Sequence, residues 1–370
     1  MKQYDLKPVK DATKDFDRCS YDNVYCCYVN GNKEIRAMYF DRLSSLPRQD
    51  ALKYFEILKE SVKGTVNKNT FSAGFSRSAD QENGTKEVLR FMVREGVSRD
   101  IFAEFVSRLM DSVNMENETN YLITVFENTI DIRPRGTDRL AIDDASEFSF
   151  HYLVAAVCPA KLSDPGLSYD EEEMIFRTRI TDWVAGKPVV ALLYPAPAGD
   201  GADMDHAVVF SKAKEPEEAE DFIRSFTGLE EVPVASKKAF EQLKEVISQT
   251  VNIEQRPEAL DIIDERLDIY RENHADDDDA VITKEELREI VEESGIPKEE
   301  LSDFDRKFEN AVENAGIPVY AIKELKPELK KTNVVIKAKD ASVIKRKEFD
   351  GEEYLLVPLS EGVKLNSEVL

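Results

Sequence analysis

The residues best suited to chemistry are two aspartates and a histidine in one short stretch. Asp203, Asp205 and His206 lie close together in sequence, and Asp200 stands just upstream. Carboxylate oxygens and an imidazole are ligands for a divalent metal ion. In an extended segment, however, the aspartates at 203 and 205 share one face and His206 points to the other. The sequence therefore predicts a divalent-metal site or, as the alternative, a polar loop that enters a strand.

Other candidate groups do not match known catalytic patterns. The acidic run Asp276–Asp279 lacks the glycine at position six and the glutamate at position twelve of an EF-hand loop. His151 and Cys158 lie on opposite faces of one extended strand, so we do not expect a thiol–imidazole pair. We assign no catalytic residue and no cofactor apart from the candidate metal.

One stretch near the C-terminus is basic in an acidic chain. The formal net charge is -24, and a field of that sign repels polyanions from most of the surface. Between Lys323 and Lys347, nine lysines and arginines stand against three acidic residues. Cations in such a stretch can contact DNA phosphates. The candidates are Lys330, Lys331, Lys337, Lys345, Arg346 and Lys347. The alternative is intramolecular docking of this segment on the acidic helices.

Alternating strands and helices must position these residues. Apolar residues on both faces of 148–158 predict a central strand that is covered above and below. Further strands are predicted over 189–194 and 207–210.

Hairpins are predicted over 23–39, around Asn30-Gly31-Asn32, and around Asp350-Gly351. Thr283 with Glu286 predicts a capping box at the start of a helix. Apolar residues at helical spacing predict helices near 51–62 and 99–113.

The composition changes twice along the chain, which predicts three parts. We expect an α+β protein with an α/β domain at 1–212, built on a mixed or antiparallel sheet with helices. An acidic helical region at 213–315 and a basic, β-rich module at 316–370 follow. No apolar run approaches the roughly 20 residues that span a bilayer, and the four cysteines form no CxxC pair. A reduced, cytoplasmic protein without membrane contact is expected.

Two resemblances extend this interpretation. Over nearly its whole length the chain resembles a bacterial family of unknown function, common in Firmicutes. The stretches that carry the resemblance are LPRQDALKYFEILKESVKGTVNKNTF, SFHYLVAAVCPAKLSDPGLSYDEEE and FRTRITDWVAGKPVVALLYPA. The C-terminal NVVIKAKDASVIKRKEFDGEEYLLVPLSEGVKL resembles NdpA-type nucleoid-associated proteins. The first resemblance implies no activity, and the second implies DNA binding.

The expected function is that of a non-enzymatic binding or assembly protein, nucleoid-associated through its basic module. Two alternatives remain open. One is a metal-dependent hydrolase that uses Asp203, Asp205 and His206. The other is an interaction scaffold whose acidic helices bind a basic protein. An oligomer is compatible with each of these functions.

Overall fold

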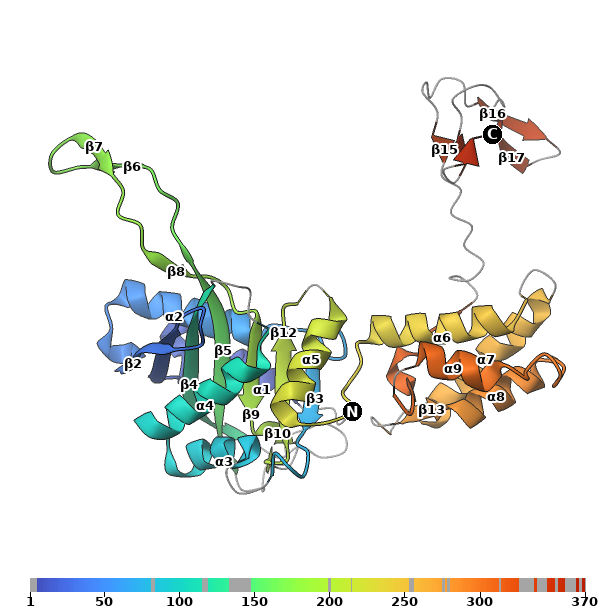
Figure 1. The fold of residues 1–370 in the computed structure, drawn as a ribbon, viewed down its shortest axis with the longest axis horizontal. Coiled ribbons are helices and arrows are strands. Elements are labelled where there is room, and N and C mark those ends of the chain that lie inside the picture. The colour runs from blue at the N-terminus through green and yellow to red at the C-terminus, as the bar shows by residue number, and fades with distance from the viewer. Residues whose placement is uncertain are drawn as a thin grey trace.

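The chain adopts an α+β fold, as the sequence predicts (Figure 1). The structure is a computed structural model. It describes residues 5–80, 84–114, 119–132, 148–198, 201–213, 215–252, 256–274, 277, 280–312, 314–325, 336–337, 345–349, 352–356, 364–365 and 368–369. No helix among these residues is both long enough and apolar enough to cross a bilayer.

An antiparallel sheet organises the N-terminal part of the chain. Its strand order is β2-β1-β4-β5-β9-β12-β3, and β8 pairs with the outer end of β5. Its strands are β1 (Asn23–Val29), β2 (Ile35–Arg42), β3 (Thr70–Gly74), β4 (Asn120–Ile132), β5 (Phe148–Leu162), β8 (Trp183–Ala185), β9 (Val190–Tyr194) and β12 (His206–Ser211). The hairpin predicted over 23–39 is confirmed as the β1–β2 pair.

Helices cover both faces of this sheet. They are α1 (Lys7–Asp11), α2 (Arg48–Ser61), α3 (Thr85–Glu95), α4 (Arg99–Ser112) and α5 (Pro216–Thr227). Along β5, Leu153 and Ala155 pack in the core beneath α3, α4 and α5. Val154 and Ala156 pack in the opposite core beneath α1 and α2. The predicted central strand is thus confirmed, because a strand buried on both faces must be apolar on both.

Helix α5 belongs to the sheet rather than to the helices that follow it. Its apolar face, including Phe222 and Phe226, lies in the core beneath α3 and α4. A boundary after residue 212 would separate α5 from the core that it completes. Composition alone assigns α5 to the acidic helical region, because the acidic outer face of α5 resembles the helices that follow. The sheet unit therefore extends through Thr227.

A second unit packs four helices around its own core. Its elements are α6 (Ser236–Thr250), α7 (Pro257–Asn273), β13 (Val281–Thr283), α8 (Lys284–Glu293), α9 (Phe304–Ala311), β14 (Gly316–Pro318) and the 3-10 turn η3 (Val319–Ala321). The capping box predicted at α8 is confirmed, since Thr283 and Glu286 each accept from the other's backbone amide. Residues through Leu325 pack in this core, so the unit continues beyond 315.

Short strand pairs complete the described chain. They are β6 (Leu167–Asp170) with β7 (Ile175–Thr178), β10 (Ala196–Ala198) with β11 (Gly201–Asp203), and β16 (Lys345–Phe349) with β17 (Glu352–Leu356); β18 (Lys364–Leu365) pairs with β15 (Ile336–Lys337) and with β19 (Glu368–Val369). The hairpin predicted around Asp350-Gly351 is confirmed by the β16–β17 pairing. The β6–β7 hairpin projects away from the body of the sheet (Figure 1).

Candidate functional site

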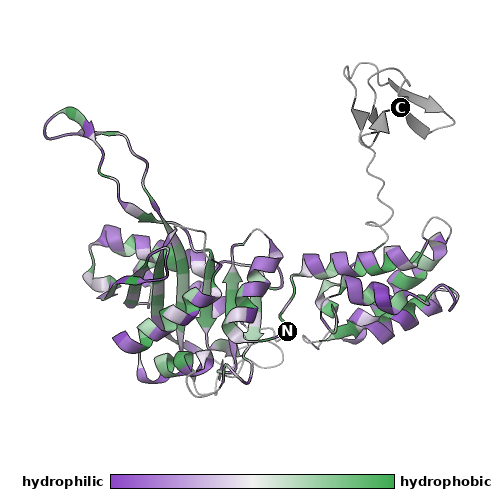
Figure 2. Cartoon of the chain, in the orientation of Figure 1, coloured by the Kyte–Doolittle hydropathy of each residue, from purple (hydrophilic) through white to green (hydrophobic). Residues whose placement is uncertain are grey.

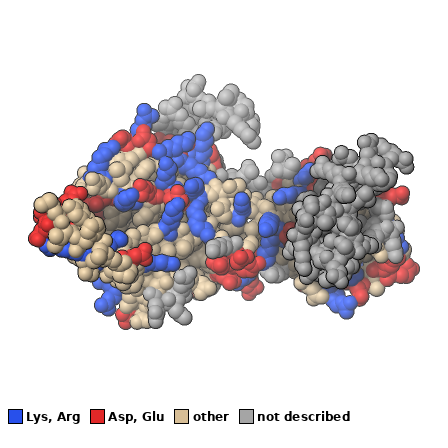
Figure 3. Space-filling view, turned by 90° about the horizontal axis from the view of Figure 1, so that it is seen from above, with Lys and Arg blue, Asp and Glu red and all other residues tan. Residues whose placement is uncertain are grey.

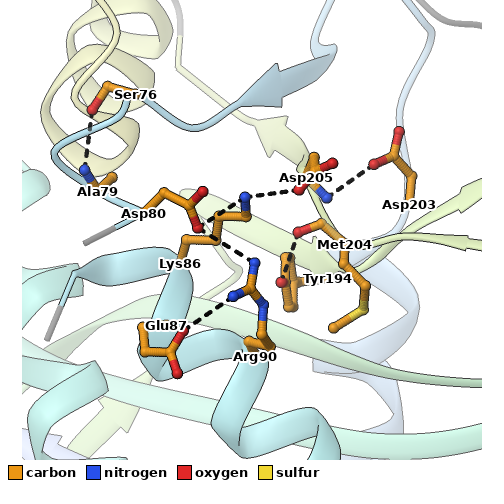
Figure 4. Close-up of polar contacts among 10 residues, drawn as sticks. All are labelled: Ser76, Ala79, Asp80, Lys86, Glu87, Arg90, Tyr194, Asp203, Met204 and Asp205. Atoms are coloured by element: carbon orange, nitrogen blue, oxygen red, sulfur yellow. Dashed lines mark hydrogen bonds and ion pairs between the residues drawn. The ribbon is translucent and has the colours of Figure 1, made fainter. Parts of the chain in front are cut away.

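The predicted metal ligands lie where β11 turns into β12. Asp203 Oδ2 is 3.0 Å from His206 Nδ1, and Asp203 Oδ1 accepts a hydrogen bond from the Asp205 amide. The Asp205 carboxylate reaches instead to Lys86, with Oδ1 2.7 Å from Nζ (Figure 4). The structure thus brings Asp203 and His206 together, and it directs the Asp205 side chain to a cation.

No group of three His, Cys, Asp or Glu side chains in the described part of the chain is arranged to hold a metal ion. Asp200, the fourth candidate ligand, lies outside the described residues, as do three of the aspartates in Asp276–Asp279. The metal site stays a prediction, and within the described residues it rests on the Asp203–His206 pair.

Lys86 is a buried cation that forms ion pairs near the β11–β12 turn. We call Lys86 and its neighbours Asp80, Arg90 and Asp205 the Lys86 corner. Only 5% of the surface of Lys86 is exposed, and its Nζ lies 3.0 Å from Asp80 Oδ1 as well as 2.7 Å from Asp205 Oδ1. Arg90, one turn along α3, reaches the same Asp80 oxygen and also Glu87 (Figure 4). Burial alone would lower the pKa of Lys86, but hydrogen bonds to Asp205 and Asp80 outweigh it and raise the pKa.

These ion pairs have a structural role, because they hold α3 against the β11–β12 turn. The hydrogen bond from Lys86 lowers the pKa of Asp80, so the lysine and the carboxylate both stay charged near neutral pH. Groups with pKa values displaced away from neutrality make poor general acids or bases. Lys86 joins the start of α3 to the turn that carries Asp203 and His206. Its place one turn before Leu89, on the buried face of α3, is the sequence pattern that could have revealed it.

His151 contacts polar side chains of a neighbouring strand, and Cys158 lies in the core. His151 Nδ1 lies 2.9 Å from Thr129 Oγ1, and its Nε2 lies 3.3 Å from Glu127 Oε1. Cys158 is buried in the opposite core, and burial raises the pKa of its thiol to about 12. The sulfur is therefore a thiol at neutral pH, and it does not meet the imidazole.

Only four of the six predicted DNA-contacting residues lie in the part of the chain that the structure describes. Lys330 and Lys331 lie outside the described residues. Lys337 belongs to β15, and Lys345, Arg346 and Lys347 belong to β16. The structure describes these four as strand backbone only. DNA contact by this module stays a prediction.

The sequence interpretation missed the most unusual surface of the molecule. Residues 163–182, here called the arm, form the projecting ribbon that ends in β6 and β7. Backbone hydrogen bonds from Ser163 to Asp182 and from Arg179 to Gly166 hold its two sides together. Large apolar side chains on this ribbon face solvent: Leu167 is 69% exposed, Phe176 67% and Ile180 81%. Figure 2 shows hydrophobic residues interspersed with hydrophilic ones along the arm.

A family model described as a domain of unknown function, DUF4317, matches residues 1–367. The chain belongs to this family. The predicted near full-length resemblance is thereby confirmed. No curated protein matches the chain.

Two hollows adjoin the elements of this DUF4317 chain described above. One, of about 410 Å³, lies between the edge of the sheet and the helical unit; of the three predicted metal ligands, only His206 lines it. Hydrogen bonds from Asn314 to the Val232 carbonyl and from Tyr320 to the Val234 carbonyl close that junction. The other, of about 910 Å³, runs between α2 and residues 183–188 at the base of the arm. We call this second hollow the groove.

Proposed function

We propose that this chain is a non-enzymatic assembly protein that attaches to a protein surface through its arm. The single observation that carries the proposal is the row of solvent-facing apolar side chains on residues 163–182. Contiguous exposed apolar surface is typical of sites that bind another macromolecule. Function therefore follows from the arm rather than from a catalytic cluster.

The energetics favour a covered arm. An isolated two-stranded ribbon is marginally stable in water, and β6–β7 pairs over only four residues on each strand. Burying one large apolar side chain contributes about 1.5–3 kcal/mol. Covering Leu167, Phe176 and Ile180 would then supply on the order of 5 kcal/mol toward association, before the entropic cost of binding.

The polar groups of the sheet unit support binding over catalysis. Lys86 is occupied by Asp80 and Asp205, and His151 by Glu127 and Thr129. DNA contact through β16 and metal-dependent hydrolysis at the Asp203–His206 pair remain separate hypotheses. Neither depends on the arm.

Site-specific photo-crosslinking tests the proposal. A photoreactive phenylalanine analogue replaces Phe176 of the full chain in its native cells. The control carries it at Phe91, an exposed phenylalanine on α3 away from the arm. We expect a protein adduct from position 176 and none from position 91. Absence of an adduct at Phe176 and also at Leu167 and Ile180 would overturn the proposed function.

A further inference from the structure

We propose that the arm binds a second copy of this chain, and that each copy lays its arm in the groove of the other. This inference rests on the proposed function, since it names the partner of the same arm. Arm and groove are both present on every copy. A two-fold axis can therefore form the contact twice, as in a closed dimer.

The groove offers the apolar surface that such an arm needs. Its apolar lining residues include Leu46, Tyr54, Ile57, Leu122, Trp183 and Val184. Trp183 and Val184 are themselves about half exposed. They follow the last residue of the arm directly in the chain, so the groove begins at the base of the arm.

The turn of the arm is acidic. It carries four consecutive acidic residues, 170–173. Asp170 and Glu173 pair with Arg177. For Glu171 and Glu172, no cation of the described residues lies within salt-bridge distance.

The lining of the groove holds three acidic and three basic residues, and two of its lysines have no acidic partner among the described residues. Of the acidic residues, Glu56 pairs with Lys53 and Glu60 with Lys63, and no cation of the described residues lies within salt-bridge distance of Asp50. Lys59 and Lys187 line the groove, and no carboxylate of the described residues lies within salt-bridge distance of either. Glu171 and Glu172 of one copy would pair with Lys59 and Lys187 of the other in the proposed contact, and such opposite charges favour association and fix its register. In a chain of net charge -24, this supplies a specific attraction between copies that otherwise repel.

Further cations lie just past the end of α2. Lys10 and Lys212 donate from Nζ to the carbonyls of Gly64 and Lys63, just beyond the helix. The backbone of Lys212 donates to Val189, next to the groove residue Pro188. Figure 3 shows lysine and arginine side chains gathered on the upper face of the sheet unit. An acidic turn that lies along the groove would end near these cations.

The dimensions of the two elements agree. The arm has twenty residues, 163–182, and a ten-residue strand spans roughly 33 Å. Helix α2 has 14 residues, which corresponds to about 21 Å. The arm is thus long enough to follow α2 from end to end and bring its acidic turn to Lys59 or Lys187.

Sedimentation equilibrium of the purified full chain tests the inference. At low salt we expect a species of twice 42.1 kDa. Glu171→Lys with Glu172→Lys should raise the dimer Kd at least tenfold, and so should Lys59→Glu with Lys187→Glu. Combining all four changes should restore the Kd to within about threefold of wild type, because the charge pairs are rebuilt in reverse.

A matched control carries the same change of charge elsewhere. Glu285→Lys with Glu289→Lys, on the exposed face of α8, should leave the Kd within about threefold. A monomer at all concentrations would overturn the second copy as partner, and so would a dimer that both charge reversals leave unchanged.

The crosslinking result separates the two proposals. A Phe176 adduct at twice the chain's mass supports both. A Phe176 adduct of another mass, with a monomeric purified chain, keeps the assembly function and overturns the second copy as partner. A monomer with no adduct on the arm overturns both.

Discussion

The arm and the Lys86 corner invert the usual relation between residue type and burial. On the arm, Ile180 is 81% exposed, whereas at the start of α3 the side chain of Lys86 is almost wholly buried. The lysine is buried because two carboxylates compensate the loss of water. The isoleucine is exposed because its ribbon leaves the sheet before any helix can cover it. Burial thus depends on the position of an element and not on its composition.

The two regions also differ in how their interactions are used. The corner uses its charges within the chain, where Lys86 holds α3 against the β11–β12 turn. On the arm, large apolar side chains face solvent, and Glu171 and Glu172 have no cation of the described residues within salt-bridge distance. Substitutions at the corner should therefore change folding stability, and substitutions on the arm should change association.

Among the charged and polar residues, the largest effect on stability is expected from Lys86→Ala. Removing the buried stem and its ion pairs should lower the free energy of unfolding by about 2–4 kcal/mol. Urea denaturation measures this loss. The exposed Lys237→Ala, on α6, is the control and should change the free energy by less than about 0.5 kcal/mol. Equal losses of unfolding free energy at the two positions would show that the ion pairs of Lys86 do not stabilise the fold.

A second paired charge, Glu127 beside His151, should show a smaller, pH-dependent effect. The hydrogen bond from His151 is the main cause that lowers the pKa of Glu127 from 4.5 to about 2, against the opposing effect of burial. A depressed folded-state pKa contributes stability above the unfolded value, and the contribution is lost as pH falls toward 2. Glu127→Gln should therefore cost about 1–2 kcal/mol at pH 6, allowing for solvent screening.

Chemical denaturation from pH 6 down to pH 2.5 measures that difference. The gap between wild type and Glu127→Gln should shrink steadily below pH 4.5. Glu289→Gln, at an exposed position on α8, makes the same change of side chain and serves as the comparison. A gap that stays constant across the range would contradict the role assigned to the Glu127–His151 pair.

The helical unit supplies a prediction of intermediate size. Thr283→Ala removes the side chain that caps α8 and should cost about 1 kcal/mol. Thr283→Ser keeps the hydroxyl and should recover most of that loss. Thermal unfolding followed by circular dichroism measures both variants. If Ser and Ala prove equally destabilising, the methyl group rather than the cap is responsible.

The smallest effect on folding is expected on the arm. Leu167→Ser with Phe176→Ser should change the free energy of unfolding of the monomer by less than about 0.5 kcal/mol, because these side chains are already in water. Urea denaturation at protein concentrations below the dimer Kd measures it. Phe105→Ala, in the core beneath α4, is the buried counterpart and should cost about 3–5 kcal/mol. A comparable loss on the arm would show that the arm packs within its own chain.

Sequence patterns predicted those parts of the fold that depend on neighbouring residues. Alternation along 148–158 identified β5 and the two cores that it separates. Turn residues identified the hairpins at 23–39 and around Asp350-Gly351, and the spacing of Thr283 and Glu286 identified the cap of α8. These patterns succeed because pleat, turn and cap geometry are set within a few residues.

The candidate site was less predictable. Spacing alone placed Asp203, Asp205 and His206 in one cluster, but it could not show that Asp205 would pair with Lys86. That lysine is distant in sequence, and only the packing of α3 against the β11–β12 turn brings it near. The same holds for α5, whose acidic outer face concealed an apolar face that completes the sheet unit.

By itself the sequence determined the central strands, the hairpins, several helices, the acidic character of the chain and its resemblance to an uncharacterised family. Only the tertiary structure decided that Lys86 is buried, that α5 joins the sheet, and that residues 163–182 project from it. The physical reason is that local geometry depends on neighbouring residues, whereas burial depends on which distant elements compete to cover a surface. The arm is the surface that no element of the described chain covers.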